Sequence, residues 1–452
     1  MIIAKFGGTS VADAAAITRT VNIIRGCVDR QPVVVVSALA GTTNALIAAA
    51  EQAATGHLVT AIAQVEAMRD RHLGVVTALL GDGDEALDIA AEESMLFDEL
   101  AHLAEALSVL GYLTPRSLDM ISSLGEQLSA PIVTAAFRRA GIDAELVDGR
   151  DVMITDDSYG RAEPIPDLIA AATREHLAPL IRAGKVPVLG GYIGATEAGV
   201  TTTLGRGGSD YTASLIGAAL EAEAIEIWTD VDGLLTADPR VVQGVRLIEH
   251  IRFDEAAELA SFGAKVLHPN TISPAVKRGI PVFIFNSLRP EGLGTRITFD
   301  APRLPVRAIA GKNNVVVVKV RSPRMLAAPG ALRAIFEVFE RNRTSVDVVA
   351  TSEVSVSLTV DDDLHLDAVV AQLRAFGDVS VERGRGIVAL VGAGLGESSP
   401  TMAAALTAIG DVRLHMLSLS ATGINLTLIV DGDQVKPVMQ RLHAQFFGPG
   451  SA

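Results

Sequence analysis

The sequence predicts an α/β fold: a three-layer domain with a mainly parallel central sheet, followed by two smaller βαββαβ modules. Two observations support this prediction. Over residues 1–285, short runs rich in Val and Ile alternate with helical stretches, which is typical of a parallel sheet covered by helices. From residue 315 onward, the order strand, helix, strand, strand, helix occurs twice, which indicates an internal repeat.

The chain of 452 residues is long enough for two or three domains with a large core. Hydrophobic residues make up 49% but aromatic residues only 4%, so Ala, Val, Leu and Ile must build that core. A net charge of −15 argues against a nucleic-acid partner, because neutralising phosphates requires basic surfaces. The single cysteine, Cys27, excludes an intrachain disulfide framework and suits a reducing cytoplasm.

Residues 31–50 are uncharged, which raises the question of a membrane span. Their middle, 41–44, is Gly-Thr-Thr-Asn, a turn signature that would break a spanning helix. The chain starts with strand-like residues and shows no basic region followed by an apolar core, so we expect no signal peptide. We therefore expect a cytoplasmic protein without a membrane partner.

The first element is a predicted strand at 1–6 that carries Lys5. Gly7-Gly8-Thr9-Ser10 follows at once, and 12–24 predicts a helix. Strand, glycine turn and helix together suit phosphate binding, with Lys5 as a point charge. This is not a Walker A loop, because the lysine precedes the glycines. A surface lysine on an edge strand is the alternative.

The second predicted strand, 33–36, is β-branched throughout, as expected of a central parallel strand. It leads to Ser37 and then Thr43, at the strand end where ligands bind in open α/β sheets. An ordinary strand-to-helix turn is the alternative for these residues.

Residues 45–110 are rich in Ala with helical periodicity, so they predict a helical hairpin or bundle packed on the sheet. We expect 123–126 to begin a further helix. Glu126 then either receives a substrate ammonium group or simply favours the positive first turn of that helix.

The stretch TTTLGRGGSDYT at 201–212 is the centre of the predicted site. Its threonines suit a strand end, and its glycines allow backbone N–H groups to approach a ligand closely. An apolar run at 213–220 predicts a helix, with Ser209 at its N-cap and Asp210 in its first turn. Arg206 is a planar fork suited to a carboxylate. A tight turn without a ligand is the alternative.

The remaining elements follow from the same patterns. Strands are predicted at 144–147, 187–190, 224–228 and 280–285, and helices at 165–181 and 253–262. A stretch rich in Pro, Gly and Arg, 288–314, predicts the domain boundary. The repeated strand and helix segments are 315–320, 330–342, 346–350, 354–360 and 366–376, then 387–391, 401–409, 412–418, 424–430 and 435–446. Two such units predict ferredoxin-like modules.

Five motifs in order together resemble aspartate kinase. They are KFGGTS at Lys5, TTTLGRGGSD at Thr201, WTDVDG at Trp228, TADPR at Thr236 and FGAKVLHP at Phe262. The resemblance covers the whole chain and implies an amino acid kinase domain at 1–298, a linker at 299–314, and ACT modules at 315–384 and 385–452. TSEVSV at 351–356 further resembles the single-chain class inhibited by lysine.

The resemblance implies a role for each matching residue. Lys5 and Lys265 would neutralise the transferring phosphoryl group, and Asp210 would orient them. ATP would be bound by Lys5, Gly7, Gly8, Thr9, Ser37, Thr229, Asp230, Arg240 and Lys265. Aspartate would be bound by Thr43, Glu126, Gly191, Tyr192, Arg206 and Ser209. The effector residues would be Met325, Val346, Asp347, Thr351, Ser352 and Glu353. Mg²⁺ would accompany ATP, without a dedicated metal site in the protein.

The sequence departs from the family pattern in two places. Leu235 stands where some members have a Tyr near the adenine. Ala328 and Ala331 replace the Ser and Phe of the lysine-sensitive pattern, so the effector pocket has a smaller wall. The identity and strength of the effector, with lysine favoured, therefore stay open.

The expected reaction is ATP-dependent phosphorylation of the L-aspartate side-chain carboxylate, the first step of lysine, threonine and methionine biosynthesis. Another acyl-phosphate-forming kinase, acting on glutamate derivatives, and a catalytically silent amino-acid sensor are the alternatives. The two ACT modules disfavour the first, and Lys5, Asp210 and Lys265 disfavour the second. Paired ACT modules imply a homodimer or a dimer of dimers.

Overall fold

The computed structural model describes residues 1–262, 269–322, 329–361 and 365–448, and it divides into two compact units. The first unit comprises Met1–Leu234 and Val266–Phe299, and the second comprises Leu235–Lys265 and Asp300–Ala452. Residues 235–265, expected in the first domain, thus group with the C-terminal part. The packing explains this, because Ala237 and Val242 share one hydrophobic cluster with Val306, Ile309 and Val388.

The first unit is built on a sheet with the strand order β3-β5-β2-β1-β8-β10-β11. Only the β10–β11 pair is antiparallel, so the prediction of a mainly parallel sheet is confirmed. The strands are β1 (Ile2–Phe6), β2 (Pro32–Val36), β3 (Ala144–Val147), β5 (Val186–Gly190), β8 (Ala224–Thr229), β10 (Val282–Asn286) and β11 (Thr295–Thr298). The central strands β1, β2 and β5 are buried along their whole length, as expected of a sheet covered on both faces.

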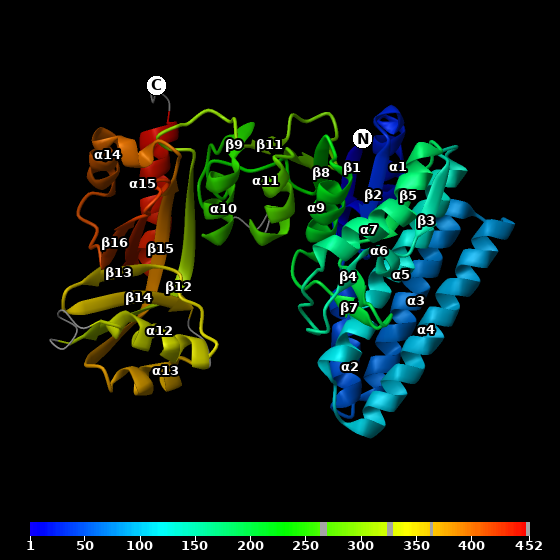
Figure 1. Cartoon of the computed structure of the whole chain (residues 1–452), viewed down its shortest axis with the longest axis horizontal. Coiled ribbons are helices and arrows are strands. Elements are labelled where there is room, and N and C mark those ends of the chain that lie inside the picture. The colour runs from blue at the N-terminus through cyan, green and yellow to red at the C-terminus, as the bar shows by residue number, and fades with distance from the viewer. Residues whose placement is uncertain (263–268, 323–328, 362–364, 449–452) are drawn as a thin grey trace. The chain divides into compact units, whose positions relative to one another are not determined.

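Helices cover both faces of this sheet (Figure 1). On one face, α1 (Ala14–Arg25) and α5 (Pro115–Arg139) bury side chains against Phe6, Val34 and Trp228. On the other face lies α9 (Gly208–Leu220), where a side chain at Gly217 would meet Ile3 and Ile225. Since successive strand residues point to opposite faces, these contacts define three layers. The three-layer prediction is confirmed.

The predicted helical bundle is present and consists of α2 (Thr42–Ala54), α3 (Leu58–Leu80), α4 (Asp84–Leu110) and α5. It has a core of its own, which includes Leu46, Val65, Phe97 and Leu124. The expected helix start at 123–126 is wrong. Helix α5 begins at Pro115, because Thr114 accepts a hydrogen bond from the Ser117 N–H and caps it.

Shorter elements complete the first unit. A small sheet has the order β4-β6-β7, with β4 (Ile154–Thr155), β6 (Ile193–Thr196) and β7 (Thr201–Thr203). The helix expected at 165–181 is divided into α7 (Pro166–His176) and α8 (Ala178–Arg182), because Pro179 has no N–H to continue a helix. The other short helices are η1 (Gly8–Val11), η2 (Val28–Arg30), α6 (Gly149–Val152), η3 (Pro269–Ile272) and α11 (Ser273–Arg278).

The second unit contains one six-stranded antiparallel sheet with the order β13-β14-β12-β15-β17-β16. Its strands are β12 (Ala308–Arg321), β13 (Val349–Ser352), β14 (Ser355–Asp361), β15 (Asp378–Val391), β16 (Met416–Leu419) and β17 (Asn425–Asp431). Its helices are α12 (Ala331–Arg341), α13 (Leu366–Leu373), α14 (Ser399–Ile409) and α15 (Val435–Phe447), with η5 (Leu395–Glu397) and η6 (Gly432–Gln434). This antiparallel architecture agrees with the predicted ACT modules.

The two modules share strands, which the sequence pattern did not reveal. Strand β12 begins at Ala308, inside the range expected as linker, and pairs with β15 along nearly its whole length. A register shift between Lys312 and Val315 interrupts the pairing, and Asn314 there has a φ of 61°. Such a bulge breaks the alternating pattern from which a continuous strand is predicted. The second unit also holds β9 (His250–Arg252) and α10 (Phe253–Ser261).

Within the described parts of the chain, every helix is either too short or too polar to cross a membrane.

Candidate active site

The first unit contains a cavity of about 690 Å³ at the carboxyl ends of its parallel strands, where such sheets bind ligands. Most of the predicted site residues meet there. Those that line it are Lys5, Gly8, Ser37, Thr43, Glu126, Tyr192, Arg206, Ser209 and Asp210. They come from the ends of β1, β2 and β5 and the turns after them, from α2 and α5, and from the loop before α9 and the first turn of that helix.

Lys5 and Asp210 form an ion pair at the centre of this cavity. The distance from Lys5 Nζ to Asp210 Oδ1 is 2.7 Å, and Lys5 is only 8% exposed. Asp210 lies in the first turn of α9, as the sequence predicted. A buried ammonium group beside a helix N-terminus produces a positive potential, which suits an anionic ligand.

Glycines bring the surrounding loops too close for any side chain. A Cβ at Gly8 would lie 2.9 Å from the Ala38 carbonyl oxygen, and a Cβ at Gly191 would lie 2.8 Å from Ser209 Cα. Gly190 meets Glu126 in the same way, because its Cβ would lie 2.9 Å from Glu126 Cβ. The backbone segments therefore pack directly against each other at these points, and among the three glycines Gly8 lines the cavity itself.

Glu126 lies in the middle of α5, and among the described residues only one of its two carboxyl oxygens has a hydrogen-bond partner. Its Oε1 accepts a hydrogen bond from the Ala38 N–H at 3.1 Å, whereas Oε2 has no hydrogen-bond partner among the described residues. The residue is 3% exposed, and burial raises the pKa of its carboxyl from 4.5 to about 8, against the opposing effect of Lys5. A cationic ligand would supply the missing partner.

Arg206 stands in the glycine loop between two left-handed residues, Gly205 (φ 75°) and Gly207 (φ 72°). Its side chain is exposed and forms no ion pair with the described carboxylates, so it is free to bind one. The predicted N-cap was wrong here. Gly207 occupies that position, and Ser209 Oγ instead accepts a hydrogen bond from Ser37 Oγ at 3.0 Å.

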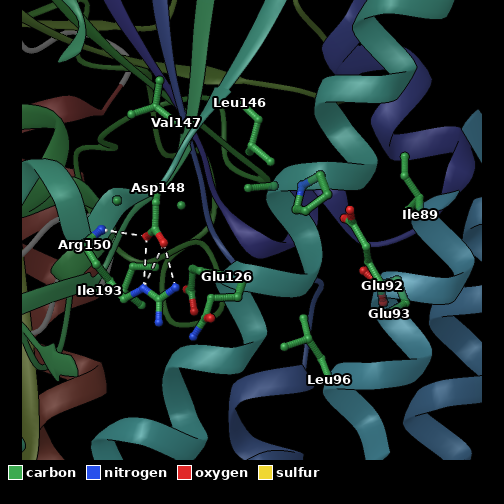
Figure 2. Close-up of a pocket in the computed structure, with 15 residues that line it drawn as sticks. Ile89, Glu92, Glu93, Leu96, Glu126, Leu146, Val147, Asp148, Arg150 and Ile193 are labelled. Carbon is green, nitrogen blue, oxygen red and sulfur yellow. Dashed lines mark hydrogen bonds and ion pairs between the residues drawn. The ribbon is translucent and has the colours of Figure 1, made fainter. Parts of the chain in front are cut away.

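A second, smaller cavity of about 180 Å³, which Glu126 also lines, lies between α4, α5 and the segment at the end of β3 (Figure 2). Asp148 and Arg150 form an ion pair at its edge, with an Nη2–Oδ2 distance of 2.6 Å. Glu93 of α4 also lines it and is 2% exposed, with an Oε2 that has no partner among the described residues. Burial raises the pKa of the Glu93 carboxyl to about 9, so it is neutral at pH 7.

The structure does not gather every predicted residue. Thr9 is exposed outside the cavity, and Thr229 and Asp230 also lie outside it, hydrogen-bonded to each other at 3.3 Å. Arg240 belongs to the second unit, where its 77% exposed side chain pairs with Asp238 at 2.7 Å. Lys265 lies outside the described residues.

Sequence analysis missed polar residues on α5 and β7 that line the same cavity. Asp119 and Ser122 precede Glu126 on α5, and Asp119 is bound to Thr203 of β7. Their spacing of three, four and seven residues is a polar stripe on one helix face, which could have revealed them. It was missed because the helix was expected to begin only at 123.

The predicted effector residues lie in the second unit. Val346 lines a hollow of about 570 Å³ beside Phe336 and Phe339 of α12. Asp347 already has a cationic neighbour, because Lys312 Nζ donates to its Oδ2 at 3.1 Å. The exposed residues Thr351, Ser352 and Glu353 stand at the end of β13 and in the turn after it, and Met325 lies outside the described residues.

Comparison with known proteins agrees with this fold. Residues 1–286 match the amino acid kinase family. The lysine-sensitive aspartokinase 3 of Escherichia coli (strain K12) is 37% identical, over 99% of both chains. The chloroplastic aspartokinase 3 of Arabidopsis thaliana is 36% identical, over 98% of this chain and 81% of its own.

Two solved structures agree as well. The crystal structure of E. coli aspartokinase III in complex with aspartate and ADP (R-state) has a TM-score of 0.87 and 36% identity, over 99% of this chain and 100% of that one. The complex of the same enzyme with lysine and aspartate (T-state) has a TM-score of 0.81 and 36% identity, over 99% of both chains. The fold and the family match together identify a kinase of the amino acid kinase class. The chain belongs to the amino acid kinase family and, within it, to the aspartokinases.

Proposed function

We propose that the chain transfers the γ-phosphoryl group of ATP to the side-chain carboxylate of L-aspartate, giving 4-phospho-L-aspartate and ADP. One observation carries the proposal: a single cavity holds a buried Lys5–Asp210 pair, a Glu126 carboxyl group with one oxygen free, and an Arg206 without an ion pair, counting partners among the described residues alone. These groups match a phosphate, an ammonium and a carboxylate. The aspartokinase relatives support this assignment.

Glu126 and Arg206 would bind the amino acid. The ammonium group of aspartate would pair with Glu126 Oε2, which has no partner among the described residues. Arg206 would take a carboxylate through two parallel N–H donors. The close approach of Gly191 to Ser209 would shape the floor beside them. Substrate binding would thus satisfy groups that stand unsatisfied in the protein alone.

Lys5 would hold the phosphoryl group while it transfers. A bond would form between a side-chain oxygen of aspartate and the γ-phosphorus, and the bond from that phosphorus to the departing ADP oxygen would break. The aspartate carboxylate is already ionised at neutral pH, so no general base is required. Lys5 would stabilise the charge that spreads over the phosphoryl oxygens, and Asp210 would fix its ammonium group. Lys265 would assist by analogy with the family motif.

The nucleotide would lie beside the glycine turn at Gly7 and Gly8. Mg²⁺ usually binds through substrate phosphates with few protein ligands, and it is proposed to bind here together with ATP. Bound with ATP, it would neutralise phosphate charge. Thr229, Asp230 and Arg240 are proposed to border the nucleotide.

The test is a coupled assay of ADP release with L-aspartate, L-glutamate and N-acetyl-L-glutamate in turn. We expect turnover with L-aspartate only. Preference for a glutamate derivative would establish the alternative kinase class, and binding without turnover would establish a sensor.

We further propose feedback regulation through the second unit, with lysine as the effector, as in the lysine-sensitive relative. The product would then feed lysine, threonine and methionine biosynthesis in the cytoplasm. A homodimer or a dimer of dimers is expected, and light scattering with and without lysine would measure the assembly.

A further inference from the structure

Asp119 is a buried carboxylate whose two oxygens are both fully used. Its Oδ1 accepts hydrogen bonds from Thr203 Oγ1 at 2.7 Å and from the Gly160 N–H at 3.0 Å. Its Oδ2 accepts from the Gly160 N–H at 2.9 Å and from the Thr203 N–H at 3.1 Å. The residue is 1% exposed and lines the large cavity together with both partners. Every donor it meets belongs to another segment of the chain.

The segments that Asp119 joins are those that carry the two charged groups proposed for aspartate. Asp119 and Glu126 are seven residues apart on α5, so they share one helix face and lie about 10 Å apart along its axis. Thr203 is the last residue of β7, and Arg206 follows it after two residues. Helix α5 and strand β7 also pack against each other.

A second contact supports the same arrangement. The Leu204 N–H donates to the Tyr192 carbonyl at 2.9 Å, and the Tyr192 hydroxyl lies 3.3 Å from Ser122 Oγ on α5. Tyr192 has a φ of 64°, a conformation that costs a non-glycine residue free energy and needs support from its surroundings. The loop that carries Arg206 is therefore fixed on α5 at two neighbouring points.

We propose that Asp119 is a positioning residue that fixes the Arg206 loop relative to Glu126 and thereby sets the distance between the two groups that bind aspartate. This rests on the proposed function. Asp119 does not itself bind substrate, because its four acceptor interactions are all made within the protein. It acts through Arg206.

The primary test is the steady-state kinetics of Asp119→Asn in the full chain. An amide keeps one acceptor oxygen for the N–H groups, but its NH₂ group can only donate, so the Thr203 hydroxyl would have to turn round and accept. The charge-assisted bonds are lost as well, so the connection to β7 is weakened without loss of volume. We expect KM for aspartate to rise about tenfold or more, because small misplacements of binding groups have large effects. KM for ATP should change less than about twofold, and kcat should fall less than KM rises.

Two further variants separate positioning from general destabilisation. Thr203→Val removes one bond and keeps the Thr203 N–H bond to Asp119, so a smaller rise of about threefold in KM for aspartate is expected. Thr114→Ala removes the N-cap of the same helix without touching β7 or the cavity. It should leave both KM values within about twofold of wild type.

A double-mutant cycle tests whether Asp119 acts through Arg206. In an Arg206→Lys background, Asp119→Asn should raise KM for aspartate by much less than it does alone, because coupled residues are not additive. Full additivity would overturn the proposal, and so would a wild-type KM for Asp119→Asn or an equal rise in Thr114→Ala. If the wild-type chain does not phosphorylate aspartate at all, the proposed function fails and this inference with it.

Discussion

Lys5 is placed where few lysines are found, because a buried ammonium group needs a charged partner. Asp210 supplies that partner at 2.7 Å, and the helix N-terminus behind it favours an anion in addition. The pair therefore fits a group that stabilises negative charge during phosphoryl transfer. The catalytic role of Lys5 can be tested by comparing it with a lysine that pairs with a carboxylate elsewhere in the same unit.

Lys5→Ala should lower kcat more than a hundredfold, since removing a preorganised donor from a developing charge costs about 3 kcal/mol or more. Lys185 is the matched control, because it pairs with Glu145 at 2.9 Å away from the cavity. Lys185→Ala should retain kcat within about twofold. A folded Lys5→Ala protein with near-wild-type kcat would refute the assignment.

Glu126 should make aspartate binding depend on pH. Because the pKa of its buried carboxyl is raised to about 8, it is mostly protonated at pH 6.5 and becomes ionised as the pH rises. The ammonium group of aspartate needs the ionised form, so kcat/KM for aspartate should rise from pH 6.5 through about 8 and level off only about one pH unit above that pKa. Glu126→Gln should have a low kcat/KM and should lose this rise. A pH profile unchanged by Glu126→Gln would rule out the role.

At the scale of elements, helix α4 has a buried glutamate, Glu93, whose raised pKa keeps its carboxyl group protonated at neutral pH. The pKa of Glu93 is raised by burial from 4.5 to about 9, so the folded state holds a proton that the unfolded state releases. This contribution to stability is complete below pH 4.5 and is lost as the pH rises through about 9, by up to about 1.4 kcal/mol per pH unit.

Thermal unfolding between pH 6 and pH 9 checks this expectation. Glu93→Gln keeps a neutral side chain of the same shape, so its Tm should fall less with rising pH than that of wild type. The exposed Asp88 on the same helix gives the control, because it lies outside the smaller cavity, and Asp88→Asn should follow the wild-type curve. Parallel curves for wild type and Glu93→Gln would show that Glu93 is not protonated in the folded state.

The close packing of backbone segments at Gly191 can also be tested by substitution. A Cβ at Gly191 would lie 2.8 Å from both Ser209 Cα and Val35 Cγ1, so Gly191→Ala must displace the wall of the site. We expect lower stability and a KM for aspartate raised about tenfold or more. Gly74 is the control, because a Cβ there meets nothing within 4 Å in helix α3, and Gly74→Ala should stabilise by about 0.5–1 kcal/mol. Equal kinetics for the two variants would contradict this account.

Local signals in the sequence predicted the elements that depend on local chemistry. The strand carrying Lys5, the helix after Arg206 and the position of Asp210 all follow from glycines, β-branched runs and helix periodicity. The helix start at Pro115 was missed, and with it Asp119 and Ser122 as site residues. The bonds between Asp119 and Thr203 join residues far apart in sequence, so no local pattern could have indicated them.

At the scale of the whole molecule, the packing divides the chain at other residues than the predicted domain limits. Residues 235–265 group with the second unit because Ala237 and Val242 complete a hydrophobic cluster there. Buried contacts of that kind depend on tertiary packing, which a motif does not show. The shared strand β12 was hidden by the bulge between Lys312 and Val315.

Regulation also belongs to this scale. Lys312 already pairs with Asp347, and the sequence has alanines at 331 and at 328, of which 328 lies outside the described residues. We therefore expect lysine to inhibit more weakly here than in relatives with the larger Ser and Phe. The double variant Ala328→Ser with Ala331→Phe should shift the inhibition curve to lower lysine concentration and leave uninhibited kcat unchanged. Identical lysine inhibition curves for the wild type and the double variant would show that residues 328 and 331 do not set the strength of inhibition. Strong inhibition of the wild type by threonine alone would identify a different effector.

The central claim is that the side-chain carboxylate of aspartate is the phosphoryl acceptor. Hydroxylamine converts an acyl phosphate into a hydroxamate, so the product formed from ATP and L-aspartate can be trapped and its position determined by NMR. We expect the β-hydroxamate of aspartate, formed in proportion to the ADP released and absent with Lys5→Ala. ADP release without any hydroxamate, or a hydroxamate at the α-carboxyl, would contradict it.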